Sequence, residues 1–101
     1  MQLTERQRRH LKGLAHPLSP IIRVGNAGVT PSVVAETGRA LADHELIKVR
    51  VAAADREARD AAIESLAAET GSALVGRVGH VAILYRRHPD RPRILLPATS
   101  V

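Results

Sequence analysis

The segment Leu46 to Ala52, "LIKVRVA", constrains the fold most strongly because its residues alternate between apolar and basic. Ile47, Val49 and Val51 share one face of the predicted strand, and Lys48 and Arg50 share the other. Segments with helical periodicity precede and follow this strand. A strand between two helices predicts an α/β chain in which an apolar sheet face is covered by helices.

A first helix is predicted over residues 4–16, where Thr4 and Gln7 have the spacing of a capping box. Pro17 and Pro20 then end the helix. We expect its buried stripe to contain Leu11, Leu14 and Ala15. We expect its solvent side to present Arg9, Lys12 and His16.

Two further helices have clear start signals. Thr30 is a predicted N-cap followed by Pro31, and this helix is expected to end near Asp43. Its predicted buried face consists of Val33, Val34, Thr37 and Leu41. Asp55 is the predicted cap of the third helix, which should reach about Thr70 and stop at Gly71.

The remaining strands are predicted at residues 21–25 and in a hairpin that turns at Gly79 and His80. This register pairs Val78 with Val81, Gly76 with Ile83, and Leu74 with Tyr85. The segment "RILL", residues 93–96, is a candidate for a short edge strand. The expected element order is α-β-α-β-α-β-β, with a largely parallel sheet that the final hairpin makes mixed.

The strand alternation predicts which side chains share a face of the sheet. Lys48, Arg50, Arg77 and Arg86 are expected together on the open face, and Arg23 joins them if Ile22 and Val24 point inward. The helices are expected to cover the other face, formed by Ile47, Val49, Val51, Val81 and Ile83. Tyr85 then belongs to the core, which leaves no exposed aromatic for base stacking.

Positive charge is concentrated at the two ends of the chain. The net charge is +5, but residues 1–35 carry +4, residues 36–69 carry −3 and residues 70–101 carry +4. Arginine supplies 13 of the 15 basic residues, and its planar fork matches phosphate geometry better than lysine does. This distribution favours a nucleic-acid partner, although many small basic proteins have none.

Several other classes of function lack support in the sequence. There is no Cys, so disulfides and Cys-ligated zinc are excluded, and no histidine pair has the spacing of a helical metal site. No apolar run has the length of a membrane span, and the N-terminus lacks the apolar core of a signal peptide. P-loop, dinucleotide and nucleophile-elbow patterns are also missing. We expect a cytoplasmic protein that is not an enzyme and needs no cofactor.

The loop "VGNAGVTP", residues 24–31, contains a Gly-x-x-Gly pattern between a predicted strand and a predicted helix start. Its glycines permit close approach of another backbone. The helix N-terminus that follows favours an anion such as phosphate. The same pattern also occurs in ordinary strand-to-helix turns, so the loop alone does not decide between binding and structure.

An ordered set of segments resembles the CRM domain family, most closely its small stand-alone bacterial YhbY-type members. The segments are "LKGLAH" at residues 11–16, the Gly-x-x-Gly loop, "HELIKV" at residues 44–49, and "ETG" at residues 69–71. The resemblance extends from Gln2 to about Pro97, which implies one domain over residues 2–97 and a flexible tail over 98–101.

The resemblance implies an RNA-binding domain like the C-terminal domain of translation initiation factor three, in which helices pack on one face of a mixed four-stranded sheet. It implies a role in assembly of the large ribosomal subunit, with pre-ribosomal RNA as partner. The family's loop, which is likened to that of KH domains, maps onto Gly25 to Gly28. Many relatives have Lys or another polar residue in this loop, whereas Ala27 is small and apolar, so a side-chain salt bridge from the loop is not available.

The residues and the resemblance together predict an RNA-binding protein with no enzymatic activity. Two alternatives remain open: a module that docks on a ribosomal protein, and a small nucleotide-binding enzyme. Steep loss of affinity with salt would distinguish RNA binding from the protein-docking alternative. The predicted RNA-binding residues are Arg9, Lys12, His16, Arg23, Gly25, Asn26, Ala27, Gly28, Lys48, Arg50, Arg77 and Arg86.

Overall fold

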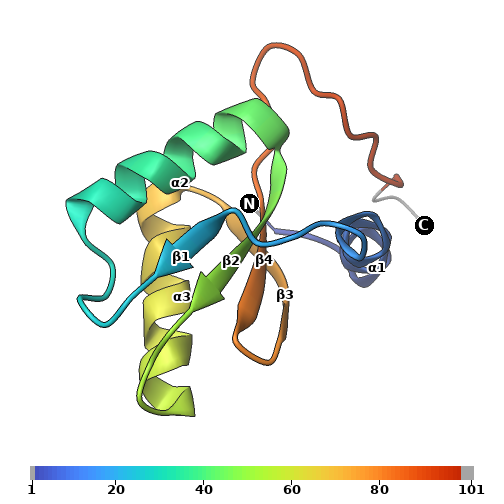
Figure 1. Ribbon diagram of the computed structural model, residues 1–101. Helices are drawn as coiled ribbons and strands as arrows, with labels where there is room; N and C mark the ends of the chain where they lie inside the picture. The colour runs from blue at the N-terminus through green and yellow to red at the C-terminus, as the bar shows by residue number, and fades with distance from the viewer. Residues whose placement is uncertain (1, 99–101) are drawn as a thin grey trace.

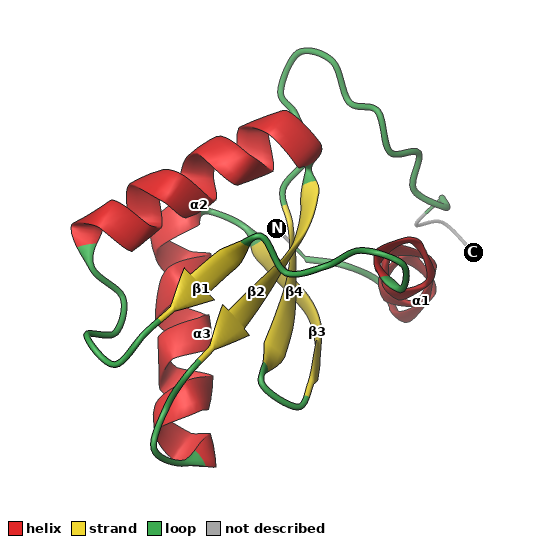
Figure 2. Ribbon diagram, viewed as in Figure 1, coloured by secondary structure: helices red, strands yellow, loops and turns green. Residues whose placement is uncertain are grey.

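A computed structural model describes residues 2–98 and contains three helices and four strands (Figure 2). The predicted order of elements is confirmed, and the boundaries agree within a few residues. The elements are α1 (Glu5–Ala15), β1 (Ile22–Val24), α2 (Pro31–His44), β2 (Leu46–Val51), α3 (Arg56–Thr70), β3 (Ala73–Val78) and β4 (Val81–Tyr85).

The four strands form one sheet in the order β1-β2-β4-β3. β1 pairs with β2 in parallel, whereas β4 is antiparallel to both β2 and β3. The sheet is therefore mixed, as predicted. The sheet was expected to be largely parallel, and β1, β2 and β3 do run in the same direction. Only β1 and β2 pair in parallel, however, because β4 lies between β2 and β3 and runs the opposite way.

The helices cover both faces of the sheet, so the prediction that all of them pack on one face is wrong. Figure 1 shows α2 and α3 on one side of the sheet and α1 on the other. The core under α2 and α3 contains Leu41, Ile47, Val49 and Leu66. A second core under α1 contains Leu11, Ala15, Leu46, Val75, Ile83 and Tyr85. The second core exists because β2 and β4 are apolar on both faces at the end of the sheet that α1 covers.

A bulge in β3 changes the predicted faces. Val78 pairs with Val81 and Gly76 with Ile83, as predicted, but the register shifts between Leu74 and Gly76. Tyr85 therefore pairs with Ala73 instead of Leu74. A bulge adds one residue to one strand, and strand periodicity alone does not reveal it.

The pairing of β4 with β2 also corrects the assignment of faces. Ile83 lies opposite Lys48 and Val81 lies opposite Arg50, so these apolar residues share the α1 face with the two basic residues. Tyr85 is buried as predicted, but beneath α1 and not beneath α2 and α3.

The ends of the helices follow the local sequence signals. Thr4 and Gln7 form the predicted capping box, with the Gln7 backbone N–H donating to Thr4 Oγ1 at 3.0 Å. Thr30 caps α2 ahead of Pro31, and Asp55 caps α3. One burial prediction in α1 is wrong: Leu14 is 43% exposed. The buried line of α1 instead follows Gln7, Leu11 and Ala15, whose spacing of four residues keeps them on one face.

Residues 86–98 form an irregular segment, here called the C-terminal arm, and the predicted strand at residues 93–96 is not formed. Figure 2 shows the arm leaving β4 near the end of α2 and continuing toward α1. Near its far end, Gln7 Nε2 donates to the Pro97 carbonyl at 3.0 Å. Residues 99–101 of the predicted tail lie outside the described residues.

Glu45 holds the C-terminal arm on the body of the protein. Its side chain is fully buried and accepts backbone N–H bonds from His88, Arg93 and Ile94 at 2.8–3.0 Å. Burial opposes ionisation, but these donors and the Arg93 charge outweigh it and lower the pKa of the Glu45 carboxyl. The backbone of Glu45 has φ 63°, a conformation rare in residues other than glycine.

We expect that removal of the buried Tyr85 hydroxyl stabilises the protein. This buried oxygen has no hydrogen-bond partner among residues 2–98, and burial followed by the nearby Glu45 charge raises the pKa of Tyr85. Tyr85→Phe removes the unsatisfied group and keeps the ring, so we expect stability to increase by about 1 kcal/mol. Urea unfolding at neutral pH measures this change. A decrease in the unfolding midpoint would show that the hydroxyl has a partner.

Candidate nucleic-acid interface

A groove of about 450 Å³ lies on the α1 face of the sheet, beside the helix. It combines cations from α1 and β2 with apolar side chains from the β3–β4 hairpin. Its lining residues are Lys12, His16, Pro20, Lys48, Arg77, Val78, Val81 and Ile83.

Helix α1 supplies one wall of the groove. Lys12 and His16 are four residues apart and therefore lie on one side of the helix, with Arg9 one turn earlier on the same side. All three side chains are exposed, as predicted. The end of the Lys12 side chain crosses Gly76 so closely that a Cβ at that position would lie 2.7 Å from Lys12 Cε. The glycine in β3 thus provides the space in which Lys12 lies over the sheet.

Lys48 lies on the side of β2 away from α2 and α3, as predicted, but α1 packs on this side, which was expected to be open. Lys48 also has a structural role. Its ammonium group donates to the carbonyl oxygens of His16 at 3.2 Å and Leu18 at 2.9 Å. These carbonyls follow the end of α1, where a cation offsets the negative end of the helix dipole. Lys48 therefore fixes the connector between α1 and β1 and adds positive charge to the groove.

Arg23 and Arg50 extend the basic surface across the neighbouring strands. They are directly paired in the parallel register of β1 and β2, and both are exposed. Ile22 and Val24 are buried, so the condition for Arg23 to join the basic face is met. The pattern of alternation thus correctly placed Lys48, Arg50 and Arg23 on one face.

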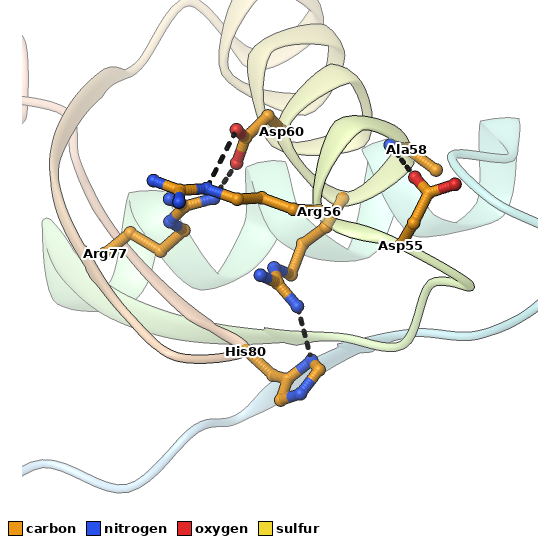
Figure 3. A network of polar contacts seen from close by, with 7 residues as sticks. Asp55, Arg56, Ala58, Asp60, Arg77 and His80 are labelled. Atoms are coloured by element: carbon orange, nitrogen blue, oxygen red, sulfur yellow. Dashed lines mark hydrogen bonds and ion pairs between the residues drawn. The ribbon is translucent and has the colours of Figure 1, made fainter.

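Arg77 and Arg86 do not join this surface, which corrects the sequence prediction. The Arg77 guanidinium forms an ion pair with Asp60 on α3 (Figure 3), although Arg77 also borders the groove. Arg86 donates to the carbonyls of Thr70 at 2.8 Å and Gly38 at 2.9 Å, which ties α2 to α3. The antiparallel pairing of β4 with β2 places Val81 and Ile83 on the α1 face. The opposite face of the β3–β4 hairpin, which carries Arg77 and Arg86, therefore lies on the α2–α3 side.

Helix α3 also supports the tip of the β3–β4 hairpin. Figure 3 shows His80 beside the first turns of α3, and Arg59 Nη1 lies 3.0 Å from His80 Nδ1. Asp55 caps the same end of α3 by accepting from the Ala58 N–H at 2.8 Å. The hairpin that forms the floor of the groove is therefore held from the opposite face of the sheet.

The Gly-x-x-Gly loop is a tight turn in which the Gly28 N–H donates to the Gly25 carbonyl at 3.0 Å. Gly28 has φ 77°, which a residue with a side chain rarely adopts. Gly25, Asn26 and Ala27 are exposed. The loop leads directly into α2, where Thr30 Oγ1 accepts from the Val33 N–H at 3.2 Å.

The loop lies at the same end of the sheet as the β3–β4 hairpin. The Ala52 N–H donates to the Val24 carbonyl at 2.9 Å, just before the loop, and the Val51 N–H donates to the His80 carbonyl at 2.7 Å. The ends of β1 and β2 thus connect the loop to the hairpin. Arg23 and Arg50 lie one residue before these bonds, between the groove and the loop.

Sequence reasoning missed two residues that hold segments together on the α1 side of the protein. Arg8 is not among the predicted RNA-binding residues, but its guanidinium donates to the carbonyl of Leu74 at 2.6 Å and anchors α1 on β3. Glu45 gave no signal of burial because it lies between a helix and a strand, where a charged residue is normally solvated. The Arg8–Leu74 contact joins residues 66 apart and the Glu45–His88 contact joins residues 43 apart, so no local pattern reports them.

The described residues contain no group of three or more His, Asp or Glu side chains placed to hold a metal ion. None of the helices within residues 2–98 is long and apolar enough to cross a membrane.

A small α+β domain with arginine and lysine gathered on one sheet face has the kind of basic surface that is typical of nucleic-acid-binding domains. Residues 3–86 match the model of the CRS1 / YhbY (CRM) domain. The chain belongs to this family, as the sequence resemblance predicted, and the CRM domain is an RNA-binding domain.

The relatives of this chain are similar over nearly its whole length. A Haemophilus influenzae protein named "RNA-binding protein" is 45% identical over 95 residues, covering 94% of this chain and 95% of the relative. The Pseudomonas aeruginosa protein PA4753 is 44% identical over 89 residues, covering 88% and 86%. The solution structure of SAV1595 from Staphylococcus aureus has a TM-score of 0.83 and 32% identity, and the match covers 95% of this chain and 100% of that one.

Proposed function

We propose that this protein binds RNA through the groove on the α1 face and the adjoining Gly-x-x-Gly loop. The observation that supports the proposal best is the placement of exposed Lys12, Arg23 and Arg50 on one sheet face. The family and the names of its relatives support RNA as the partner.

The chemistry of this surface suits a phosphate backbone. Arginine forks and the lysine ammonium neutralise phosphates and release counterions, so binding weakens as salt increases. The loop adds backbone N–H groups and the positive end of the α2 dipole. The loop side chains are Asn26 and Ala27, so these contacts are backbone contacts and do not read sequence.

We further propose that the RNA is large-subunit ribosomal RNA in a pre-ribosomal particle, and that the protein is a cytoplasmic assembly factor and not an enzyme. The resemblance to YhbY-type proteins supports this role. The remaining predicted site residues fit unequally: Arg9 and His16 extend the surface along α1, whereas Arg77 and Arg86 are engaged with α3 and α2.

Replacement of two arginines tests the proposed surface. We expect Arg23→Ala with Arg50→Ala to weaken RNA binding and to reduce the slope of log affinity against log salt by up to roughly 2, because two phosphate contacts are lost. Both side chains are exposed, so the thermal unfolding midpoint should change little. Fluorescence anisotropy with labelled large-subunit rRNA fragments, from low to moderate salt, gives both quantities.

The control is Arg39→Ala with Arg91→Ala, which removes the same charge from exposed positions on α2 and the C-terminal arm. We expect this variant to keep the salt slope of the parent. Equal loss of affinity in both variants would mean that net charge matters and that the α1 face has no special role. A parent protein whose affinity hardly depends on salt would favour the protein-docking alternative.

A further inference from the structure

The floor of the groove is apolar, and phosphate contacts leave this surface unused. Val78 ends β3 and is 73% exposed, and Val81 faces it directly across the hairpin. Ile83 continues the floor beneath α1. Val78 and Val81 are adjacent across the hairpin, so they form one contiguous apolar patch that an apolar group of a ligand can cover.

The rim of the groove is basic, whereas its floor is apolar. Lys12, His16 and Lys48 stand around the apolar floor, and none of the described residues that line the groove is acidic. The complementary occupant is therefore a flat apolar group linked to negative charge. A nucleobase on its sugar–phosphate chain has this chemistry. The groove volume of about 450 Å³ is in the range of sites that enclose one small ligand.

We propose that this groove receives one unpaired nucleobase of the bound RNA, which lies on Val78 and Val81 while the adjoining phosphates contact Lys12 and Arg50. The proposal rests on the RNA-binding function proposed above and specifies its substrate as a single-stranded or bulged segment. A paired base is stacked on both faces and cannot reach a floor below a rim of side chains, whereas an unpaired base can. The contact is aliphatic because Tyr85 is buried, so it discriminates weakly among the four bases.

Abasic substitution tests the proposal without changing the protein. A single-stranded oligonucleotide from large-subunit rRNA is compared with a chain of the same length in which every base is removed, which keeps the number of phosphates constant. We expect removal of the bases to weaken binding about fivefold, at the lower end of the range for base stacking. A fully paired duplex with the same number of phosphates should bind more weakly than the single strand.

A double substitution locates the base on the floor of the groove. Val78→Thr with Val81→Thr keeps the shape and the preference for strand conformation but places a hydroxyl group in each apolar contact. We expect this variant to bind intact and abasic RNA equally and to keep the salt slope of the parent. The control, Leu95→Thr, changes an exposed leucine on the C-terminal arm and should leave the abasic effect intact. Thermal unfolding checks the fold of both variants.

Each possible outcome has a definite meaning. If abasic and intact RNA bind the parent equally, or if the duplex binds as well as the single strand, the base site is refuted and the proposed RNA-binding function stands. If the double substitution retains the abasic effect, the base binds elsewhere and this groove assignment is refuted. If no rRNA fragment binds, both proposals fail.

Discussion

Glu45→Ala is expected to destabilise the protein by about 3 kcal/mol, because the three backbone N–H groups that the carboxylate accepts lose their partner. The C-terminal arm should then detach, and Ile94 and Leu96 should leave the core under α1. This loss is a large part of the 5–15 kcal/mol typical of a domain. Urea unfolding measures the stability, and limited proteolysis detects release of the arm.

Glu45→Gly separates the effect of losing the carboxylate from the effect of the positive φ at this position. It removes the same carboxylate but relieves the positive φ of 63°, which Ala retains. We expect the Gly variant to be about 1 kcal/mol more stable than the Ala variant. Equal stability of the wild type and both variants would show that the carboxylate does not hold the arm.

The ionisation of Glu45 also predicts a pH dependence. Its folded pKa is below the ordinary value of 4.5, so its stabilising contribution is present above that value and is lost as the pH falls through the folded pKa. Acid should therefore unfold the wild type more steeply than Glu45→Gln, which has no charge to lose. Urea unfolding at several pH values between neutral and acid tests the difference. Parallel curves for the two proteins would contradict it.

Asn26→Asp with Ala27→Asp is expected to reduce RNA affinity about 30-fold at low salt. Two charges placed near a phosphate in water cost roughly 1 kcal/mol each. Both positions are exposed and both glycines remain, so the turn should persist. Acidic residues near a helix N-terminus are compatible with its dipole, so folding should be unaffected. RNA affinity at low and moderate salt measures the effect, which should shrink as salt increases.

The control for this loop is Asn26→Ser with Ala27→Ser, which changes both side chains without adding charge. We expect it to bind RNA like the wild type. A well-folded Asp variant with wild-type affinity would mean that Gly25 to Gly28 form only a turn. Thermal unfolding of all three proteins distinguishes loss of binding from loss of structure.

Local patterns predicted the elements of this fold well. The caps at Thr4, Thr30 and Asp55 and the stop at Gly71 are hydrogen-bonded or backbone-specific features encoded within a few residues. The alternation in β2 likewise placed Lys48 and Arg50 on one face. These features depend on interactions between neighbours in the chain, and such interactions are visible in the sequence.

The arrangement of the elements was less predictable. An amphipathic helix such as α1 packs equally well on either face of a sheet when both faces are partly apolar, and its sequence does not select one. The insertion of β4 between β2 and β3 decides where Arg77 and Arg86 point, and this pairing is made between distant segments. A charged residue at a helix–strand junction, such as Glu45, is normally solvated, so its burial depends on the arm that covers it.

The central position of β4 has a consequence for the order in which the protein folds. The last strand to leave the ribosome during synthesis is the one that joins β2 to β3, so the sheet cannot close until Tyr85 has emerged. Residues 2–78 contain β1, β2 and β3, but the edges of β2 and β3 that pair with β4 stay exposed until then. We therefore expect this domain to fold in one step once β4 has emerged, and not progressively from its first helix.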